Sequence, residues 1–187
     1  MIRKHMGKYL HYYEVDGWEF CSRKTVPYRE GNIKSDAVVI VPIFNTRGQS
    51  KIATIKEYRI PAGNFTYGFP AGLIDEGETS VQAAMRELKE ETGLDVVEHL
   101  YTTPPLFSSE GLTDEVVEIV YLLVEGTTSI EYLESNENIE TSVLNRNEVK
   151  ELLSQRVHFG KIGYMVLQDF VNTGFGWIFE KKMMETK

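Results

Sequence analysis

The segment from Gly72 to Leu94 constrains the fold more than any other part of this sequence, because it encodes a helix with both ends marked. Thr79 can cap the helix and Gln82, its third residue, can return the hydrogen bond, which makes a capping box. Four apolar residues at helical spacing predict one buried face: Val81, Ala84, Met85 and Leu88. Gly93 is typical of the position after a helix C-terminus. We therefore expect a helix at residues 80–92.

The same helix carries three carboxylates on one side. Glu87 and Glu91 lie about 40° apart around the axis, and Glu90 lies about 60° from Glu87. Like charges at this spacing destabilise an isolated helix, whereas a divalent cation would turn them into a ligand set. Ligands that are all oxygens suit Mg²⁺ or Mn²⁺ better than zinc. Arg86 could orient the Glu90 carboxylate. Taken alone, residues 86–91 also fit an ordinary solvated helix face.

The glycines and Glu78 around this helix complete a longer pattern. Residues 72–94 match G-x5-E-x7-R-E-U-x-E-E-x-G-U, in which U is apolar, at every specified position. This pattern is the Nudix box, and the chain resembles a Nudix hydrolase. The resemblance implies an α/β (α+β) fold, an α/β/α sandwich around a mixed sheet. It also implies hydrolysis of a nucleoside diphosphate linked to another group, with Mg²⁺ as cofactor and Mn²⁺ as the alternative ion.

The resemblance assigns roles to residues by their position in the box. Four residues are expected to hold the metal: Ala71 through its backbone carbonyl, Glu87, Glu90 and Glu91. Glu91 is also expected among the catalytic residues. Three residues are expected to support this set: Gly72, Glu78 and Arg86. Water attack on a diphosphate concentrates charge on phosphoryl oxygens, and divalent ions neutralise that charge and lower the pKa of the water.

Residues outside the box resemble the ADP-ribose and nucleotide-sugar pyrophosphatases of this family. The resemblance lies in the strand end at 55–59, the approach at 68–78 and the stretch at 109–115. It implies that Arg59 binds the diphosphate or terminal phosphate, and that Glu115 contacts substrate or water. From the residues alone, Arg59 is equally an ordinary arginine at a strand end, and Glu115 a solvated carboxylate at a strand start.

The general base of this branch usually comes from a later loop. Glu137 is the candidate, Glu140 is the alternative, and a solvated loop glutamate is the third interpretation. Glu110 stands where the branch usually has proline, so the substrate stays open. ADP-ribose or a related nucleotide sugar is the leading hypothesis. GDP-mannose, UDP-glucose, nucleoside triphosphates, or ligand sensing without turnover are the alternatives.

The remaining sequence predicts strands and helices in mixed order. Aromatic residues on both sides of an Asp-Gly pair predict a hairpin at residues 8–24. Apolar and β-branched runs predict strands at 36–44, 51–58, 115–125 and 139–144, and further helices fit at 147–154 and 162–172. A Pro/Gly loop is expected at 61–68. We divide the chain into an N-terminal β arm at 1–35, expected to form a homodimer, and a Nudix domain at 36–187.

Composition excludes other classes of function. With 20 basic and 28 acidic residues among 187, the formal charge is −8, which argues against nucleic acid as a partner. The longest apolar run is far too short to cross a bilayer. Cys21, the single cysteine, cannot form an intrachain disulfide. We therefore expect a cytoplasmic protein, with no membrane partner, that binds a small-molecule nucleotide. Motifs of serine hydrolases, P-loop enzymes and zinc sites are absent from the sequence.

Overall fold

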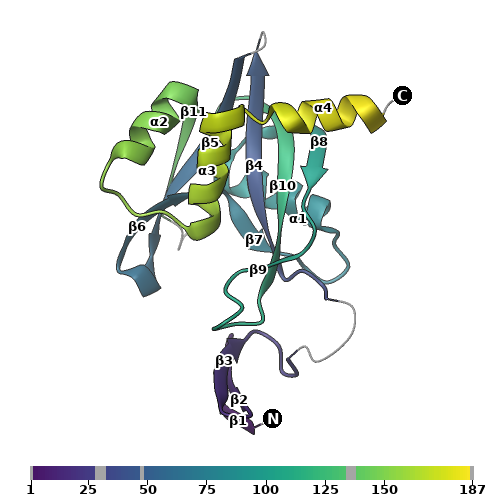
Figure 1. The fold of residues 1–187 in the computed structure, drawn as a ribbon, viewed down its shortest axis with the longest axis vertical. Coiled ribbons are helices and arrows are strands. Elements are labelled where there is room, and N and C mark those ends of the chain that lie inside the picture. The colour runs from purple at the N-terminus through teal and green to yellow at the C-terminus, as the bar shows by residue number, and fades with distance from the viewer. Residues whose placement is uncertain (1, 28–32, 47–48, 134–137, 186–187) are drawn as a thin grey trace.

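The centre of the fold is a mixed sheet, which Figure 1 shows in a computed structural model that describes residues 2–27, 33–46, 49–133 and 138–185. Its long strands lie in the order β11-β5-β4-β10-β8. Their bounds are β4 (Ala37–Thr46), β5 (Gln49–Arg59), β8 (Asp95–Thr102), β10 (Val116–Glu125) and β11 (Ile139–Asn145). Strands β4 and β10 run parallel, β8 pairs antiparallel with β10, β5 pairs antiparallel with β4, and β11 pairs antiparallel with β5.

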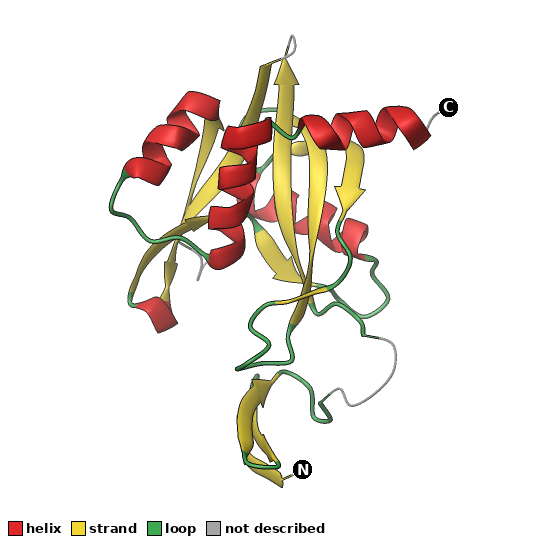
Figure 2. Ribbon diagram, viewed as in Figure 1, coloured by secondary structure: helices red, strands yellow, loops and turns green. Residues whose placement is uncertain are grey.

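Helices cover both faces of this sheet (Figure 2). On one face, α1 (Ser80–Thr92) packs against a core that includes Val38, Ile40 and Val120. The other face is covered by α2 (Arg146–Ser154), α3 (Lys161–Thr173) and α4 (Gly176–Glu185), around a core that includes Val41, Phe170 and Phe175. The predicted sandwich with a mixed sheet is therefore confirmed. Within the described residues, no helix is long and apolar enough to cross a membrane.

Helix α1 has the predicted bounds, because its end signals are local in sequence. Both hydrogen bonds of the capping box between Thr79 and Gln82 are present, and Gly93 ends the helix with φ 72°. One residue of the predicted buried face was wrong. Met85 is 44% exposed, whereas Ala84 and Leu88 are buried, because the helix turns its buried face toward the side that carries Glu91.

Short elements between the long strands correct the predicted Pro/Gly loop. That stretch holds a 3-10 turn, η1 (Ile60–Ala62), and a strand, β6 (Asn64–Gly68), which pairs antiparallel with β5. Strand β7 (Ala71–Leu73) pairs with β4, and β9 (Leu106–Phe107) pairs with β10. The loop prediction failed because tertiary pairing with β5 orders residues whose Pro and Gly content suggests a turn.

The N-terminal segment forms a separate sheet of three strands, below the main sheet in Figure 1. The predicted hairpin is β2 (His11–Val15) and β3 (Trp18–Ser22), joined at Asp16 and Gly17, both with positive φ. Strand β1 (Ile2–Met6) adds to its edge and was not predicted. The hairpin contacts the 109–115 segment of its own chain, since the Cys21 N–H donates to the Leu112 carbonyl over 2.9 Å. A domain boundary at residue 35 stays a prediction.

Candidate active site

The carboxylate of Glu87 lies directly against the backbone of Gly72. A Cβ atom built on Gly72 would stand 1.9 Å from Cδ and 2.0 Å from Oε1 of Glu87. Any side chain at residue 72 would therefore displace the Glu87 carboxylate. The pairing of β7 with β4, in which Gly72 faces Val38, fixes the backbone on one side of this contact. Helix α1 fixes the other side.

Arg86 connects the loop before α1 to the helix. Its Nε and Nη2 donate to Oε1 and Oε2 of Glu78 over 3.0 and 2.9 Å, and Nη2 also donates to the Leu73 carbonyl over 3.0 Å. The Asp75 N–H donates to Glu78 as well. The hydrogen bonds from Arg86 are the largest cause, and the one from the Asp75 backbone the next, of the lowering of the pKa of Glu78 to about 2. Glu78 is therefore ionised at neutral pH, and it holds the loop to the helix.

The same guanidinium also contacts two of the three glutamates predicted to bind the metal. Its Nη1 lies 2.7 Å from Oε1 of Glu87 and 3.4 Å from Oε2 of Glu90. Glu91, the third, is 5% exposed and belongs to the buried face of α1. Among the described residues, no three His, Cys, Asp or Glu side chains converge as a ready metal site. Positive charge between Glu87 and Glu90 comes from Arg86 here.

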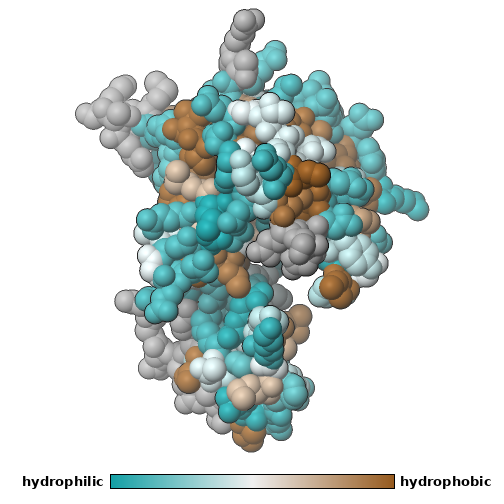
Figure 3. All heavy atoms as spheres, turned by 180° about the vertical axis from the view of Figure 1, so that it is seen from behind, coloured by the Kyte–Doolittle hydropathy of each residue, from teal (hydrophilic) through white to brown (hydrophobic). Residues whose placement is uncertain are grey.

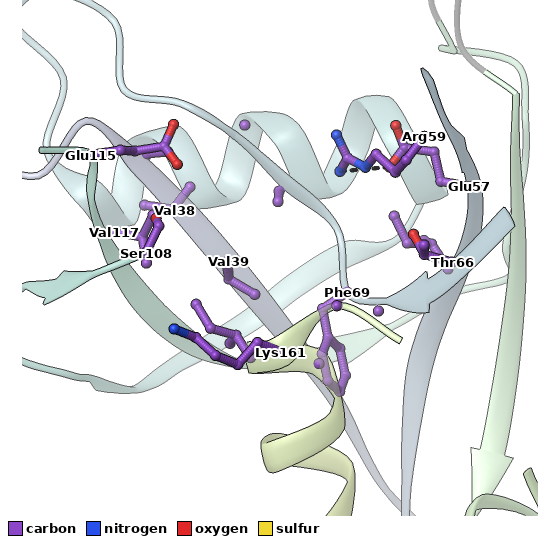
Figure 4. A pocket seen from close by; sticks show the side chains of 18 of the residues that line it. Val38, Val39, Glu57, Arg59, Thr66, Phe69, Ser108, Glu115, Val117 and Lys161 are labelled. Carbon is purple, nitrogen blue, oxygen red and sulfur yellow. Dashed lines mark ion pairs between the residues drawn. The ribbon is translucent and has the colours of Figure 1, made fainter. Parts of the chain in front are cut away.

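A pocket of about 520 Å³ opens beside this helix, and four predicted site residues line it: Arg59, Ala71, Gly72 and Glu115. Its floor is apolar, with Val38, Val39 and Phe69 (Figure 4). Arg59 and Glu57 lie on one side of the pocket and Glu115 on the other. Arg59 donates to Glu57 over 2.7 Å. The pocket thus joins the residues before the helix to the end of β5 and the start of β10.

Two cationic side chains in this pocket were missed by the sequence analysis. Arg23 follows strand β3 of the N-terminal sheet, and its Nε lies 2.9 Å from Oε1 of Glu115. Lys161 is the first residue of α3 and points toward the pocket in Figure 4. Neither residue belongs to a motif, and each reaches the pocket through tertiary contacts. With Arg59, they give the pocket three positively charged side chains.

Comparison with known proteins places this chain in a family. The model of the NUDIX domain matches residues 34–162. The chain belongs to the Nudix family. Among its relatives is "Putative nudix hydrolase 2" of Caenorhabditis elegans, 34% identical over 149 residues, which are 77% of this chain and 66% of that protein.

Two further relatives carry more specific names. The mouse (Mus musculus) ADP-sugar pyrophosphatase is 33% identical over 112 residues, which are 58% of this chain and 48% of that protein. An ADP-ribose pyrophosphatase of Saccharomyces cerevisiae is 28% identical over 170 residues, covering 88% of this chain and 71% of that protein. Apart from the yeast protein, these alignments span about half to two thirds of the relatives' length.

A solved structure supports the fold. It comes from a structure and function analysis of MutT from Aliivibrio salmonicida and Vibrio cholerae. The two structures superpose with a TM-score of 0.54 at 19% sequence identity, and the match covers 73% of this chain and 96% of the MutT chain. The Nudix box of the present chain is the β7–loop–α1 unit described above.

The donor chemistry of this Nudix box fits a hard divalent cation. Glu87, Glu90 and Glu91 offer carboxylate oxygens on successive turns of one helix, and oxygen ligands are those that Mg²⁺ and Mn²⁺ prefer. The missing side chain at Gly72 leaves room for the Glu87 carboxylate beside β7. For the ion to bind Glu87 and Glu90, Nη1 of Arg86 would have to release these two carboxylates. The hydrogen bonds from Nε and Nη2 of Arg86 to Glu78 could remain.

The candidates for the general base occupy different surroundings. Glu137 lies outside the described residues. Glu140 belongs to β11, is 61% exposed, and pairs with Lys56 over 3.0 Å; it does not line the pocket. Glu115 lines the pocket, where its Oε1 pairs with Nε of Arg23 over 2.9 Å.

Proposed function

We propose that this chain hydrolyses the pyrophosphate bond of ADP-ribose or a related nucleoside diphosphate sugar, with Mg²⁺, giving a nucleoside monophosphate and a sugar phosphate. The observation that carries the proposal is the pocket, where Arg23, Arg59 and Lys161 meet the backbone that leads into the Nudix box. A diphosphate has two negative charges to neutralise, and cationic side chains provide that beside the box carboxylates. The names of the mouse and yeast relatives agree with this substrate class.

The residues of the pocket divide the work of binding. Arg59 and Lys161 would bind the phosphate oxygens, since a guanidinium and an ammonium donate several hydrogen bonds to such anions. Glu57 holds Arg59 at the pocket rim. Glu115, held by Arg23, can accept hydrogen bonds from sugar hydroxyls or from water. The apolar floor excludes water from the side of the pocket away from the phosphates.

Hydrolysis requires one bond to form and one to break. The oxygen of a water molecule bonds to one phosphorus, the bridging P–O bond breaks, and its electron pair leaves with the departing phosphate. The proton of the water passes to a carboxylate, for which we propose Glu137. Glu87, Glu90 and Glu91, with the Ala71 carbonyl, would hold a divalent ion, which would supply neutralising charge for the phosphoryl oxygens and lower the pKa of the water. Gly72, Glu78 and Arg86 would keep these carboxylates in place.

We also infer that the protein forms a homodimer through its N-terminal sheet. Large apolar side chains of this sheet and its loop are exposed, among them Ile2, Met6, Tyr9 and Trp18. Figure 3 shows apolar side chains at the lower end of the molecule, where this sheet lies. Sedimentation should give twice the chain mass of 21.4 kDa; a fully active monomer would contradict this inference. A cytoplasmic location stays a prediction.

Product analysis with Mg²⁺ tests the proposed reaction. Purified protein is incubated separately with ADP-ribose, UDP-glucose, GDP-mannose and 8-oxo-dGTP, and products are identified by mass. We expect AMP and ribose 5-phosphate from ADP-ribose at the highest rate. Faster hydrolysis of a hexose nucleotide than of ADP-ribose would show that Glu110, in place of the usual proline, indicates a preference for a different sugar. Turnover of none of the four would refute the proposal and favour ligand sensing.

A further inference from the structure

The N-terminal sheet is attached to the pocket by a short run of contacts between residues 21–23 and 112–115. Cys21 forms a parallel bridge with Thr113, and its N–H donates to the Leu112 carbonyl over 2.9 Å. Next along the chain, Ser22 Oγ donates to Oδ2 of Asp114 over 2.9 Å. Arg23 follows Ser22 and Glu115 follows Asp114, and both Arg23 and Glu115 line the pocket.

Within this run the hydrogen bond between Ser22 and Asp114 is more buried than the ion pair between Arg23 and Glu115. Ser22 is 0% exposed, and its Oγ also accepts a hydrogen bond from the Lys24 N–H over 3.0 Å. The ion pair between Arg23 and Glu115 is more exposed, so solvent screens it and it cannot by itself hold the sheet in place.

One carboxylate oxygen of Asp114 is buried at a cost in stability. Its Oδ1 is buried and receives no hydrogen bond within the described part of the chain. A buried carboxylate oxygen without a donor is unfavourable. The other oxygen, Oδ2, accepts from the buried Ser22 hydroxyl, which would lose its acceptor if residue 114 were apolar. Asp114 is therefore held at this position by its bond to Ser22, directly before Glu115 in the chain.

We propose that the hydrogen bond between Ser22 and Asp114 positions the Arg23–Glu115 ion pair in the substrate pocket. The inference rests on the proposed function, since it concerns how that substrate is held. Ser22 and Asp114 are positioning residues: they act through Arg23 and Glu115. On the far side, Glu115 is fixed by its carbonyl, which accepts from the Ser108 N–H over 3.0 Å. The Glu115 N–H donates to Thr113 Oγ1 over 3.1 Å, and the Ser22–Asp114 bond ties the same segment to the N-terminal sheet.

The variants S22A and D114A test this role with two measurements. The first is hydrogen exchange at the Cys21 N–H, which needs no substrate. Loss of a hydrogen bond to a charged group should speed this exchange about tenfold or more. The second is kinetics with the nucleotide that turns over fastest: KM should rise about tenfold, while kcat stays within about twofold. The double variant should be no worse than either single one, because both remove the same bond.

Two controls separate positioning from general damage. S22T keeps the hydroxyl, so its Cys21 exchange rate and its KM should both equal those of the wild type. T54V removes a buried hydroxyl that donates to the Ser142 carbonyl on the main sheet, away from the N-terminal sheet, and should leave the Cys21 exchange unchanged. Unchanged exchange in S22A, or a fall in kcat with KM unchanged, would overturn the proposal. Failure of the wild type to turn over any nucleotide would refute the proposed function instead, and the exchange measurement would still decide on the Ser22–Asp114 bond.

Discussion

Replacing Gly72 with alanine should separate the position of a carboxylate predicted to bind the metal from the stability of the fold. The φ angle of Gly72 lies outside the left-handed region, so alanine brings no backbone strain. Its Cβ would, however, stand 1.9 Å from Cδ of Glu87. The carboxylate would have to move by about 1.6 Å to restore an ordinary carbon–carbon contact of about 3.5 Å.

The free energy of this shift should be small, because the atoms that move are the end of a flexible side chain. The shift breaks the 2.7 Å hydrogen bond between Glu87 and Arg86. Since Arg86 is partly exposed and keeps its two hydrogen bonds to Glu78, we expect a loss of about 1 kcal/mol in the free energy of unfolding. For a chain of this size, the melting temperature should fall by about 2–4 °C.

The effect on catalysis should be much larger. A displacement of about 1 Å at a reacting site can cost about 100-fold in rate, so we expect G72A to lower kcat about 100-fold. Mn²⁺ affinity, measured by titration calorimetry, should fall as well. G176A is the matched control, because a Cβ at Gly176 has no atom within 4 Å. A G72A protein that binds Mn²⁺ and turns over like the wild type would refute the placement of Glu87 beside Gly72.

Three further predictions follow from the site. R59A should raise KM for the nucleotide about tenfold in steady-state assays, because it removes a phosphate-binding cation; an unchanged KM would exclude this contact. E78Q should lower the melting temperature at neutral pH. Glu78 has a folded-state pKa of about 2, against an ordinary value of 4.5. In thermal scans, the difference in melting temperature between the wild type and E78Q should therefore be full above pH 5 and shrink as the pH falls from 4.5 toward 2. A difference that is independent of pH would contradict the ion pair with Arg86. E137Q should lower kcat about 100-fold or more with little change in KM, whereas E140Q should not; the reverse result would make Glu140 the base.

The elements that the sequence predicted well are those whose signals are local. Helix α1 has its predicted bounds because Thr79, Gln82 and Gly93 mark its ends within a few residues of the chain. The β2–β3 hairpin was predicted because Asp16 and Gly17 take the positive φ that its turn needs. Burial was harder to predict, as the exposed Met85 shows, since the face a helix buries depends on the sheet beneath it.

The pocket could be predicted only in part. The strand end at Arg59 and the start of β10 at Glu115 carry a family resemblance, so both were expected at the substrate. Arg23 and Lys161 carry no such signal, because they reach the pocket from a separate sheet and from the start of a distant helix. Pairing over such sequence separations is set by tertiary packing, which local patterns do not encode.

The most direct test of the account is the release of AMP from ADP-ribose by the wild type, E91Q and E151Q, first in EDTA and then with Mg²⁺. Glu151 is an exposed residue of α2, outside the pocket, and serves as the control for the loss of one charge. We predict no AMP in EDTA, rapid release with Mg²⁺ by the wild type and E151Q, and a loss of about 100-fold or more in E91Q. Wild-type rates in E91Q, or release of AMP in EDTA, would contradict hydrolysis at the Nudix box.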